Sequence, residues 1–233
     1  MYLEYVSYQC NPAPSRRSFL RTPRSQRERS ESTAARLVNV AAQMFGDEGY
    51  AAVSTDDIAA RAGMTKGALY HHFTDKSALF RAVFVQAQQQ LVATLTDSAA
   101  DAGDGWDGLI AGIDAFIREC QRTSIGRIIV FDGPAILGRD QARVVEDEYV
   151  GALLTDALRR LQEAGQMREG DSSVRSRLLL GALCEAAVVV ARSPDPVGVR
   201  KAVLYEIVTM LDGLRVHKDA MLFSQPRRSD RTT

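Results

Sequence analysis

One short stretch of the sequence gathers side chains that can donate hydrogen bonds to anions and to base edges. In AGMTKGALYHHFTDKSALF, Lys66 stands beside Gly67, and Tyr70, His71 and His72 follow one turn later. An ammonium group can donate to guanine acceptors or to phosphate, and a glycine lets the backbone approach a base edge closely. Phenol and imidazole groups suit contacts to phosphate oxygens, which explains why two of the three His stand side by side. We expect these five residues to contact double-stranded DNA.

Four further polar residues flank this stretch. Ser54 and Thr55 stand at the start of a short helix, whose free N–H groups and dipole favour an anion such as phosphate. Thr65 opens the helix that carries Lys66, and Lys76 supplies another cation just beyond that helix. We expect all four to contact DNA as well. The alternatives are that Ser54 and Thr55 only cap their helix and that Lys76 is solvated surface.

Two short helices and a turn must position these side chains. VSTDDIAARAG has Ser54 and Asp57 in a capping pattern, an apolar face, and Gly63 as its stop. The next helix is expected from Thr65 to about His72. This order predicts a helix-turn-helix, in which the second helix enters the major groove of DNA.

The rest of the chain is helical in its apolar period. One amphipathic helix is expected from Ser32 to Tyr50, and another can run from Lys76 to about Ser98. Later helices are expected at 106–122, 126–132, 140–164, 172–191 and 197–216, separated by a loop at 99–108 and by breaks such as DGP at 132–134. No strand-like alternation occurs, so the sequence predicts an all-α fold.

The stretch EGYAAVSTDDIAARAGMTKGALYHHFTDKSALF resembles the DNA-binding domain of TetR/AcrR-type transcriptional regulators. The family pattern stands in register: Gly and an aromatic residue, a Ser/Thr helix start, Ile-Ala, Ala-Gly, Lys-Gly, Leu-Tyr, a His pair with Phe, then Lys and Leu-Phe. The resemblance covers residues 32 to about 84, and DGPAILGRD at 132–140 is similar to one branch of the family. The long Arg-rich leader departs from the pattern, and is either a genuine extension or the result of an upstream start codon.

The resemblance implies an all-helical homodimer, in which the last two long helices of each subunit pair with the partner and the middle helices enclose a ligand pocket. The expected parts are a disordered Arg-rich arm at 1–30, a helix-turn-helix DNA-binding domain at 31–78, a larger helical ligand-binding and dimerisation domain at 79–220, and a disordered tail at 221–233. The arm either contacts DNA or is a solvated leader.

Candidate ligand-binding residues are aromatic or polar groups of the larger domain. They are Trp106, Phe116, Cys120, Phe131, Tyr149 and Glu185. Each has the alternative of ordinary packing in the core or in an interface. Glu185 is the most informative, because a carboxylate buried without a partner is costly. It faces solvent, pairs with an Arg or meets a ligand.

These features predict a ligand-responsive regulator. The simplest version is a repressor that binds a palindromic operator as a homodimer and is released by a small, mostly apolar effector. The alternative is an architectural or ligand-independent DNA-binding protein, which predicts no ligand pocket. An enzyme that uses Cys184, Glu185 or Asp132 with His217 lacks support, because the sequence has no nucleophile elbow, phosphate loop or H-E-x-x-H motif. We expect no catalytic residue, cofactor or metal.

The bulk composition agrees with this class. The chain is 45% hydrophobic and 25% charged, and no apolar run approaches the roughly 18 residues that would span a bilayer. Net charge is zero, yet the first 84 residues carry 11 Lys and Arg against 8 Asp and Glu. The three Cys have no metal-ligand or disulfide spacing, and the N-terminus lacks a signal-peptide pattern. We therefore expect a cytoplasmic protein without a membrane partner.

Overall fold

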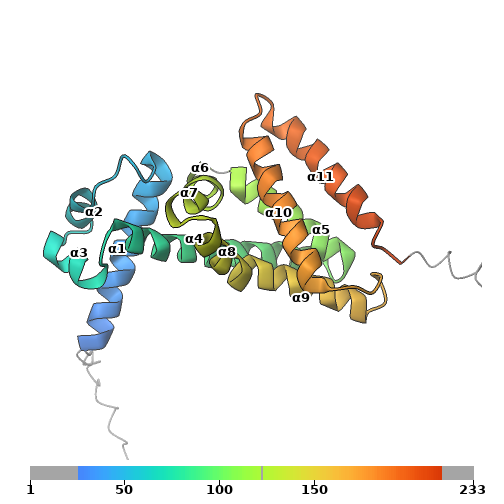
Figure 1. Cartoon of the computed structure of the whole chain (residues 1–233), viewed down its shortest axis with the longest axis horizontal. Helices are drawn as coiled ribbons and strands as arrows, with labels where there is room; N and C mark the ends of the chain where they lie inside the picture. The colour runs from blue at the N-terminus through green and yellow to red at the C-terminus, as the bar shows by residue number, and fades with distance from the viewer. Residues whose placement is uncertain (1–25, 122, 217–233) are drawn as a thin grey trace, which may run out of the picture.

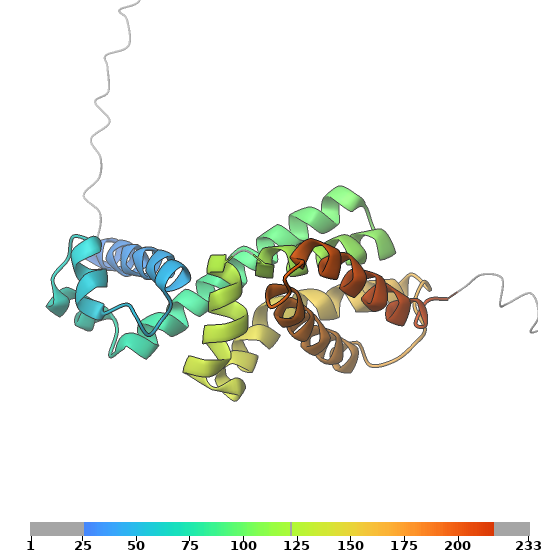
Figure 2. The same ribbon diagram turned by 90° about the horizontal axis from the view of Figure 1, so that it is seen from above.

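The computed structural model describes residues 26–121 and 123–216. Within these ranges the chain forms helices and an isolated antiparallel bridge between Met167 and Arg215, without a β-strand. The predicted all-α fold is therefore confirmed. Figures 1 and 2, which view the molecule at right angles, show an elongated shape with α1 to α3 at one end and α4 leading to the remaining helices. The expected tail and most of the expected arm lie outside the described residues.

The DNA-binding end contains three helices and the start of a fourth. They are α1 (Gln26–Glu48), α2 (Thr55–Arg61), α3 (Lys66–His72) and α4 (Lys76–Ala102). The first helix begins at Gln26 rather than Ser32, so residues 26–30 are helical and do not belong to a disordered arm. Their Gln, Arg and Glu residues are good helix formers, which favours extension of the helix toward the N-terminus. The domain boundary expected at 78 falls inside α4.

Local sequence fixes the helix-turn-helix. Ser54 and Thr65 cap α2 and α3, because their side-chain oxygens accept hydrogen bonds from the backbone N–H groups of Asp57 and Ala68 at 3.1 and 3.2 Å. Gly63 ends α2 at a φ of +66°, in the left-handed region that favours glycine. The helix ends that set the angle between α2 and α3 are therefore formed by Ser54, Gly63 and Thr65, which the sequence analysis placed at these ends.

A cluster of three aromatic rings holds α1 and α4 together at this end. The ring centroids of Phe45, Tyr50 and Phe80 lie 5.2 to 5.5 Å from one another, in tilted or edge-to-face arrangements. Leu69 of α3 is fully buried in the same core. The core thus anchors one face of α3 and leaves the opposite face to solvent.

In the described part of the larger domain, nine further helical segments follow. They are α5 (Trp106–Gln121), α6 (Thr123–Gly126), η1 (Arg127–Asp132), α7 (Gly133–Leu137), α8 (Arg139–Glu146), η2 (Asp147–Gly151), α9 (Ala152–Glu163), α10 (Ser172–Ala191) and α11 (Pro196–Asp212). The segments η1 and η2 are π-helical, a form in which hydrogen bonds join residues five apart. The single helix expected at 140–164 is therefore three segments, and the loop expected at 99–108 is confined to 103–105.

The break expected at DGP does not occur there. The N–H of Gly133 donates to the carbonyl of Ile128, five residues back, so η1 continues directly into α7. Gly133 packs tightly on α4, because a Cβ there would lie 2.4 Å from the ring of Phe84. Pro134 falls in the first turn of α7, where a proline is tolerated. The chain breaks instead at Gly138, whose φ is +79°.

Candidate DNA interface and ligand cavities

The exposed face of α3 carries four of the nine residues that the sequence predicted to bind DNA. Lys66, Gly67, Tyr70 and His71 are exposed, whereas Leu69 on the opposite face is fully buried. A Cβ on Gly67 would meet nothing closer than the Thr65 hydroxyl at 3.9 Å. The face is therefore open enough for another molecule to approach the backbone.

Two contacts hold this face against α2. The ammonium of Lys66 lies 2.9 Å from a carboxylate oxygen of Asp56, and this hydrogen bond raises the pKa of Lys66. The hydroxyls of Thr55 and Tyr70 lie 3.2 Å apart and share a hydrogen bond. Both contacts are exposed, so the side chains are held in place yet remain free to exchange these partners for phosphate.

Several other residues predicted to contact DNA make contacts within the DNA-binding domain. The Ser54 hydroxyl accepts from the Asp57 N–H and donates to its carboxylate at 2.6 Å, so Ser54 acts as a cap. Thr65 also caps its helix. The rings of His71 and His72 stand edge to face at 5.2 Å, with His72 half-buried. Contacts of these residues to phosphate stay predictions.

Lys76 has an internal role that the sequence did not reveal. Its ammonium donates to the carbonyl of Tyr50 at 2.5 Å and lies 4.1 Å from the centre of the Tyr50 ring. Burial lowers the pKa of this amine. The ammonium points toward Tyr50, so the main contact of Lys76 joins the start of α4 to the turn after α1.

Polar contacts join η1 to the DNA-binding end across 80 to 82 residues of sequence. The guanidinium of Arg127 donates to the carbonyls of Gly46 and Asp47 at 3.2 and 2.7 Å. The carboxylate of Asp132 accepts from the backbone N–H of Tyr50 at 3.2 Å. One short π-helical segment therefore holds the end of α1 and the turn that follows it.

A cavity of about 530 Å³ lies in the larger domain, between the C-terminal half of α4, α5, η2, α9 and α10. Small and aliphatic residues make most of its wall. Its polar lining comes from Thr96, Asp104, Arg160 and Gln166. The cavity has the size of a small-molecule site and a mostly apolar lining with a few polar groups, which is usual for such sites.

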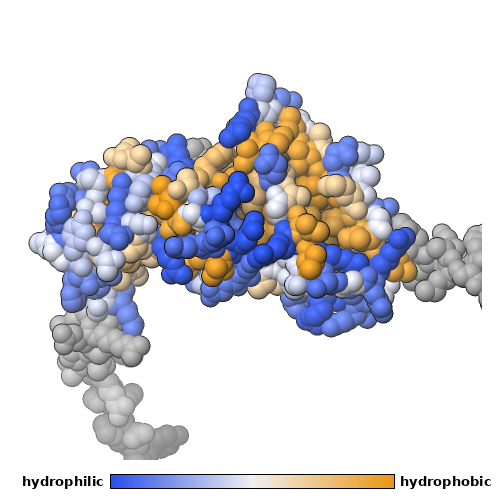
Figure 3. All heavy atoms as spheres, viewed as in Figure 1, coloured by the Kyte–Doolittle hydropathy of each residue, from blue (hydrophilic) through white to orange (hydrophobic). Residues whose placement is uncertain are grey.

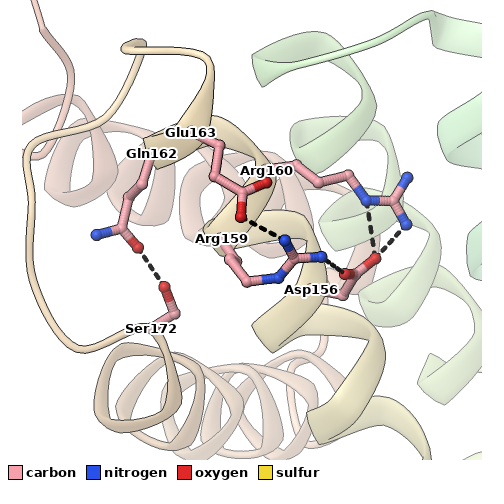
Figure 4. Close-up of polar contacts among 6 residues, drawn as sticks. All are labelled: Asp156, Arg159, Arg160, Gln162, Glu163 and Ser172. Carbon is pink, nitrogen blue, oxygen red and sulfur yellow. Dashed lines mark hydrogen bonds and ion pairs between the residues drawn. The ribbon is translucent and has the colours of Figure 1, made fainter.

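Arg160 places a cation at the wall of this cavity. Its guanidinium donates to the Asp156 carboxylate, with the Nε atom at 2.8 Å, and Arg159 donates to the same carboxylate from the other side. Figure 4 shows Asp156 between the two guanidiniums, with Glu163 on the far side of Arg159. Burial is slight, and the two arginines lower the pKa of Asp156. The network therefore fixes the direction of Arg160 rather than adding much stability.

Among the six predicted ligand-binding residues, Phe116 lines the large cavity. Glu185 is exposed and lines a second, smaller cavity. The other four line neither. Trp106 is buried, donates its indole N–H to the carbonyl of Gln166 at 3.3 Å and lies under the guanidinium of Arg215. Trp106 therefore joins the start of α5 to the turn after α9 and to Arg215, which follows α11.

Cys120, Phe131 and Tyr149 also lie outside the linings of both cavities. Cys120 is a core residue, Phe131 is 38% exposed, and the hydroxyl of Tyr149 accepts from Gln89 at 3.3 Å. Sequence reasoning instead missed the small residues that α4, α5 and the turn between them contribute to the wall, which are Ala99, Ala100, Gly103, Gly105, Gly108 and Gly112. Their repetition along one side of the α4–α5 hairpin is the signal that could have found them.

The catalytic alternative finds no support in the positions of its residues. Burial raises the pKa of the Cys184 thiol to about 12, the reverse of what a nucleophile needs. Asp132 is hydrogen-bonded to Tyr50, and His217 lies outside the described residues. Within residues 26–121 and 123–216, no helix is long and apolar enough to cross a membrane.

A helix-turn-helix with an exposed second helix, joined by one long helix to a domain with a cavity, defines a transcriptional regulator of the ligand-responsive class. The model of bacterial regulatory proteins of the tetR family matches residues 37–83, and the model described as Tetracyclin repressor-like, C-terminal domain, matches residues 106–214. The chain belongs to the TetR family of transcriptional regulators, as the sequence predicted.

Individual relatives agree with this assignment. The Transposon Tn10 TetC protein of Escherichia coli is 30% identical over 163 residues, which are 70% of this chain and 82% of that protein. The transcriptional activator FasR of Mycolicibacterium smegmatis is 32% identical over 121 residues, 52% of each chain. This chain thus spans most of the first relative and about half of the second.

Solved structures show the same fold. A TetR-family regulator from Pectobacterium atrosepticum superposes with a TM-score of 0.71 and 30% identity, over 83% of this chain and 99% of that one. RolR, solved in complex with its ligand resorcinol, has a TM-score of 0.67 and 19% identity, over 86% of this chain and 97% of its own.

Proposed function

We propose that this chain is a repressor that binds a palindromic operator as a homodimer in the cytoplasm and is released by a small, mostly apolar effector. The continuity of α4 carries the proposal. Its first turns bury Leu79 and Phe80 in the DNA-binding core, and its last turns line the large cavity with Leu95, Thr96 and Ala99. At about 1.5 Å per residue, this helix of 27 residues is about 40 Å long, so one rigid element connects the two sites.

A ligand in the cavity acts by changing the balance between two arrangements of the DNA-binding ends. If it prefers the arrangement in which the two α3 helices are wrongly spaced, it shifts the population away from DNA binding. Coupling of about 1 to 3 kcal/mol, roughly 5- to 150-fold in affinity, suffices for release. The ligand-independent alternative predicted no pocket and is disfavoured by the cavity of about 530 Å³.

The homodimer is supported by apolar side chains left exposed on the last two long helices. Figure 3 shows apolar surface gathered over α10 and α11. The exposed apolar residues there are Val174, Leu178, Val189, Val197, Tyr205 and Met210. Such a surface on neighbouring helices is typical of an interface. Two-fold symmetry would present two α3 helices to half-sites about 34 Å apart.

The test begins with a thermal-shift screen for an effector and a footprint on the DNA upstream of the protein's own gene. The effector is then titrated calorimetrically with and without that operator. Because linkage is reciprocal, an effector that releases the repressor must bind more weakly when operator is present. Equal affinity in both titrations would show that the compound does not regulate DNA binding.

A further inference from the structure

A second cavity, of about 280 Å³, lies between η1, α7, α8 and α10. No residue lines both cavities. Apolar side chains of Ile129, Val130, Pro134, Leu180 and Val188 form part of its wall. The cavity therefore offers apolar contact to a ligand separately from the large cavity.

Charged side chains from α8 and α10 complete the wall. Arg139 and Arg143 lie one turn apart on α8, and neither guanidinium makes a hydrogen bond or salt bridge to any residue that the structure describes. Arg177 of α10 is already paired with Asp147. Two adjacent guanidiniums without such partners add their positive potentials on one side of the cavity.

The carboxylates of the wall do not neutralise these two arginines. Asp147 is taken by Arg177, and Glu185 is exposed on the opposite helix. Glu146 follows Arg143 by three residues on α8. Burial raises the pKa of the Glu146 carboxyl, although the charge of Arg143 opposes this shift. Among the described residues, no hydrogen bond or salt bridge joins the Glu146 side chain to either arginine, so both guanidiniums keep donors for an anion.

The wall of this cavity belongs to the segment that holds the DNA-binding end. Ile129 and Val130 of η1 line the cavity. Arg127 and Asp132, at the two ends of the same six-residue segment, bond to the end of α1 and to Tyr50. A ligand packed on η1 therefore acts on a segment that is in direct contact with the DNA-binding domain.

We propose that the cavity between η1, α8 and α10 is a second effector site, which takes a small organic anion with an apolar tail and transmits its occupancy through η1 to the turn at Tyr50. The anion is bound by the guanidiniums of Arg139 and Arg143, and the tail lies against Ile129, Val130 and Leu180. Gly181 and Glu185 line the cavity and are exposed on α10, the helix that carries part of the surface assigned to the partner subunit. The site is therefore studied in the full chain in its own oligomeric state.

Octanoate and benzoate are the probes for a calorimetric titration. At least one should bind the wild type, and the double variant Arg139→Gln/Arg143→Gln should bind it roughly tenfold or more weakly, because charge-assisted hydrogen bonds are lost. Arg192→Gln, at an exposed arginine at the end of α10 that lines neither cavity, should bind as the wild type does. Absence of binding by both probes, or equal binding by the double variant, would overturn the proposal.

Two further measurements locate the ligand. If Arg160→Gln rather than the double variant removed binding, the anion would occupy the large cavity and the proposal would be wrong. Preference for octylammonium over octanoate would equally contradict it. Hydrogen exchange at the Tyr50 amide, whose proton is bonded to Asp132, reports whether occupancy of the cavity affects the turn at Tyr50. With the probe at ten times its Kd, exchange should slow by about twofold or more in the wild type and not in the double variant.

Discussion

The carboxylate of Asp132 accepts a hydrogen bond from the backbone N–H of Tyr50 at 3.2 Å, across 82 residues of sequence. Tyr50 in turn offers its carbonyl and its ring to Lys76. One turn of the DNA-binding domain is thus bonded both to η1 and to the start of α4. The segment η1 also lines the smaller cavity, and the opposite end of α4 lines the larger one.

Asp132→Ala should release this turn. The Tyr50 N–H loses its acceptor, so its exchange with solvent should become faster and the free energy of unfolding should fall by about 1 to 2 kcal/mol. Asp132→Asn keeps an oxygen acceptor and should restore most of the protection. Exchange measured by mass spectrometry on the peptide around Tyr50, with urea unfolding, checks both variants. Equal exchange in wild type and Asp132→Ala would mean that the contact contributes nothing.

Gly67→Glu should abolish operator binding, because it places bulk and negative charge on the exposed face of α3. Gly67→Ala is the matched control for the fold. Its Cβ meets nothing within 3.9 Å, and alanine favours a helix over glycine by about 1 kcal/mol, so the variant should melt at or above the wild-type temperature. Fluorescence anisotropy with operator DNA measures binding. Normal binding by the Glu variant would show that α3 does not face DNA.

Lys76→Ala should lower stability more than it changes the salt dependence of DNA binding. The variant loses a charge-assisted hydrogen bond to Tyr50 and a cation–π contact, together worth about 1 to 3 kcal/mol. Lys66→Ala should show the reverse pattern, because Lys66 is exposed and its only bond is an exposed pair with Asp56. Urea unfolding and binding titrations at several salt concentrations separate the two. A flattened salt slope in Lys76→Ala would restore the sequence-based interpretation of Lys76 as a phosphate contact.

Leu178→Glu should yield a folded monomer. Leu178 is 71% exposed on α10 and lies in the surface assigned to the partner subunit, where a carboxylate would be buried without a partner. Val144→Glu, at an apolar residue 62% exposed on α8, is the control and should leave the dimer intact. Light scattering at micromolar concentration reports the mass, and circular dichroism the fold. A dimer that survived the Leu178 change would move the interface elsewhere.

Glu146→Gln should stabilise the protein at neutral pH. Burial raises the pKa of Glu146 above its ordinary value of 4.5, so the folded state holds this proton more tightly than the unfolded chain does. The resulting stability is present below pH 4.5 and is lost as pH rises through the folded-state pKa. The advantage of the Gln variant over the wild type should therefore be largest near pH 7 and disappear toward pH 4. Glu148→Gln, at an exposed neighbour, should show no such trend in thermal unfolding.

The sequence alone determined the helix-turn-helix and the class of protein, because the signals involved act over a few residues. The Ser54 and Thr65 caps and the left-handed stop at Gly63 each depend on neighbours in the chain. Leu69, at helical spacing, fixed which face of α3 is buried. Local caps and one buried position are enough to orient a helix of two turns.

Only the tertiary structure decided which residues border a cavity and which join the two ends of the molecule. Helical periodicity shows that a face is buried, and it does not show whether that face meets another helix or a void. For Trp106 and Cys120 the sequence left ligand contact and packing open, and the structure buries both away from the cavities. Gly108 and Gly112 instead line the larger cavity. The bond between Tyr50 and Asp132 arises because η1 is π-helical and passes α1 in space, and no short-range pattern encodes such a distant pairing.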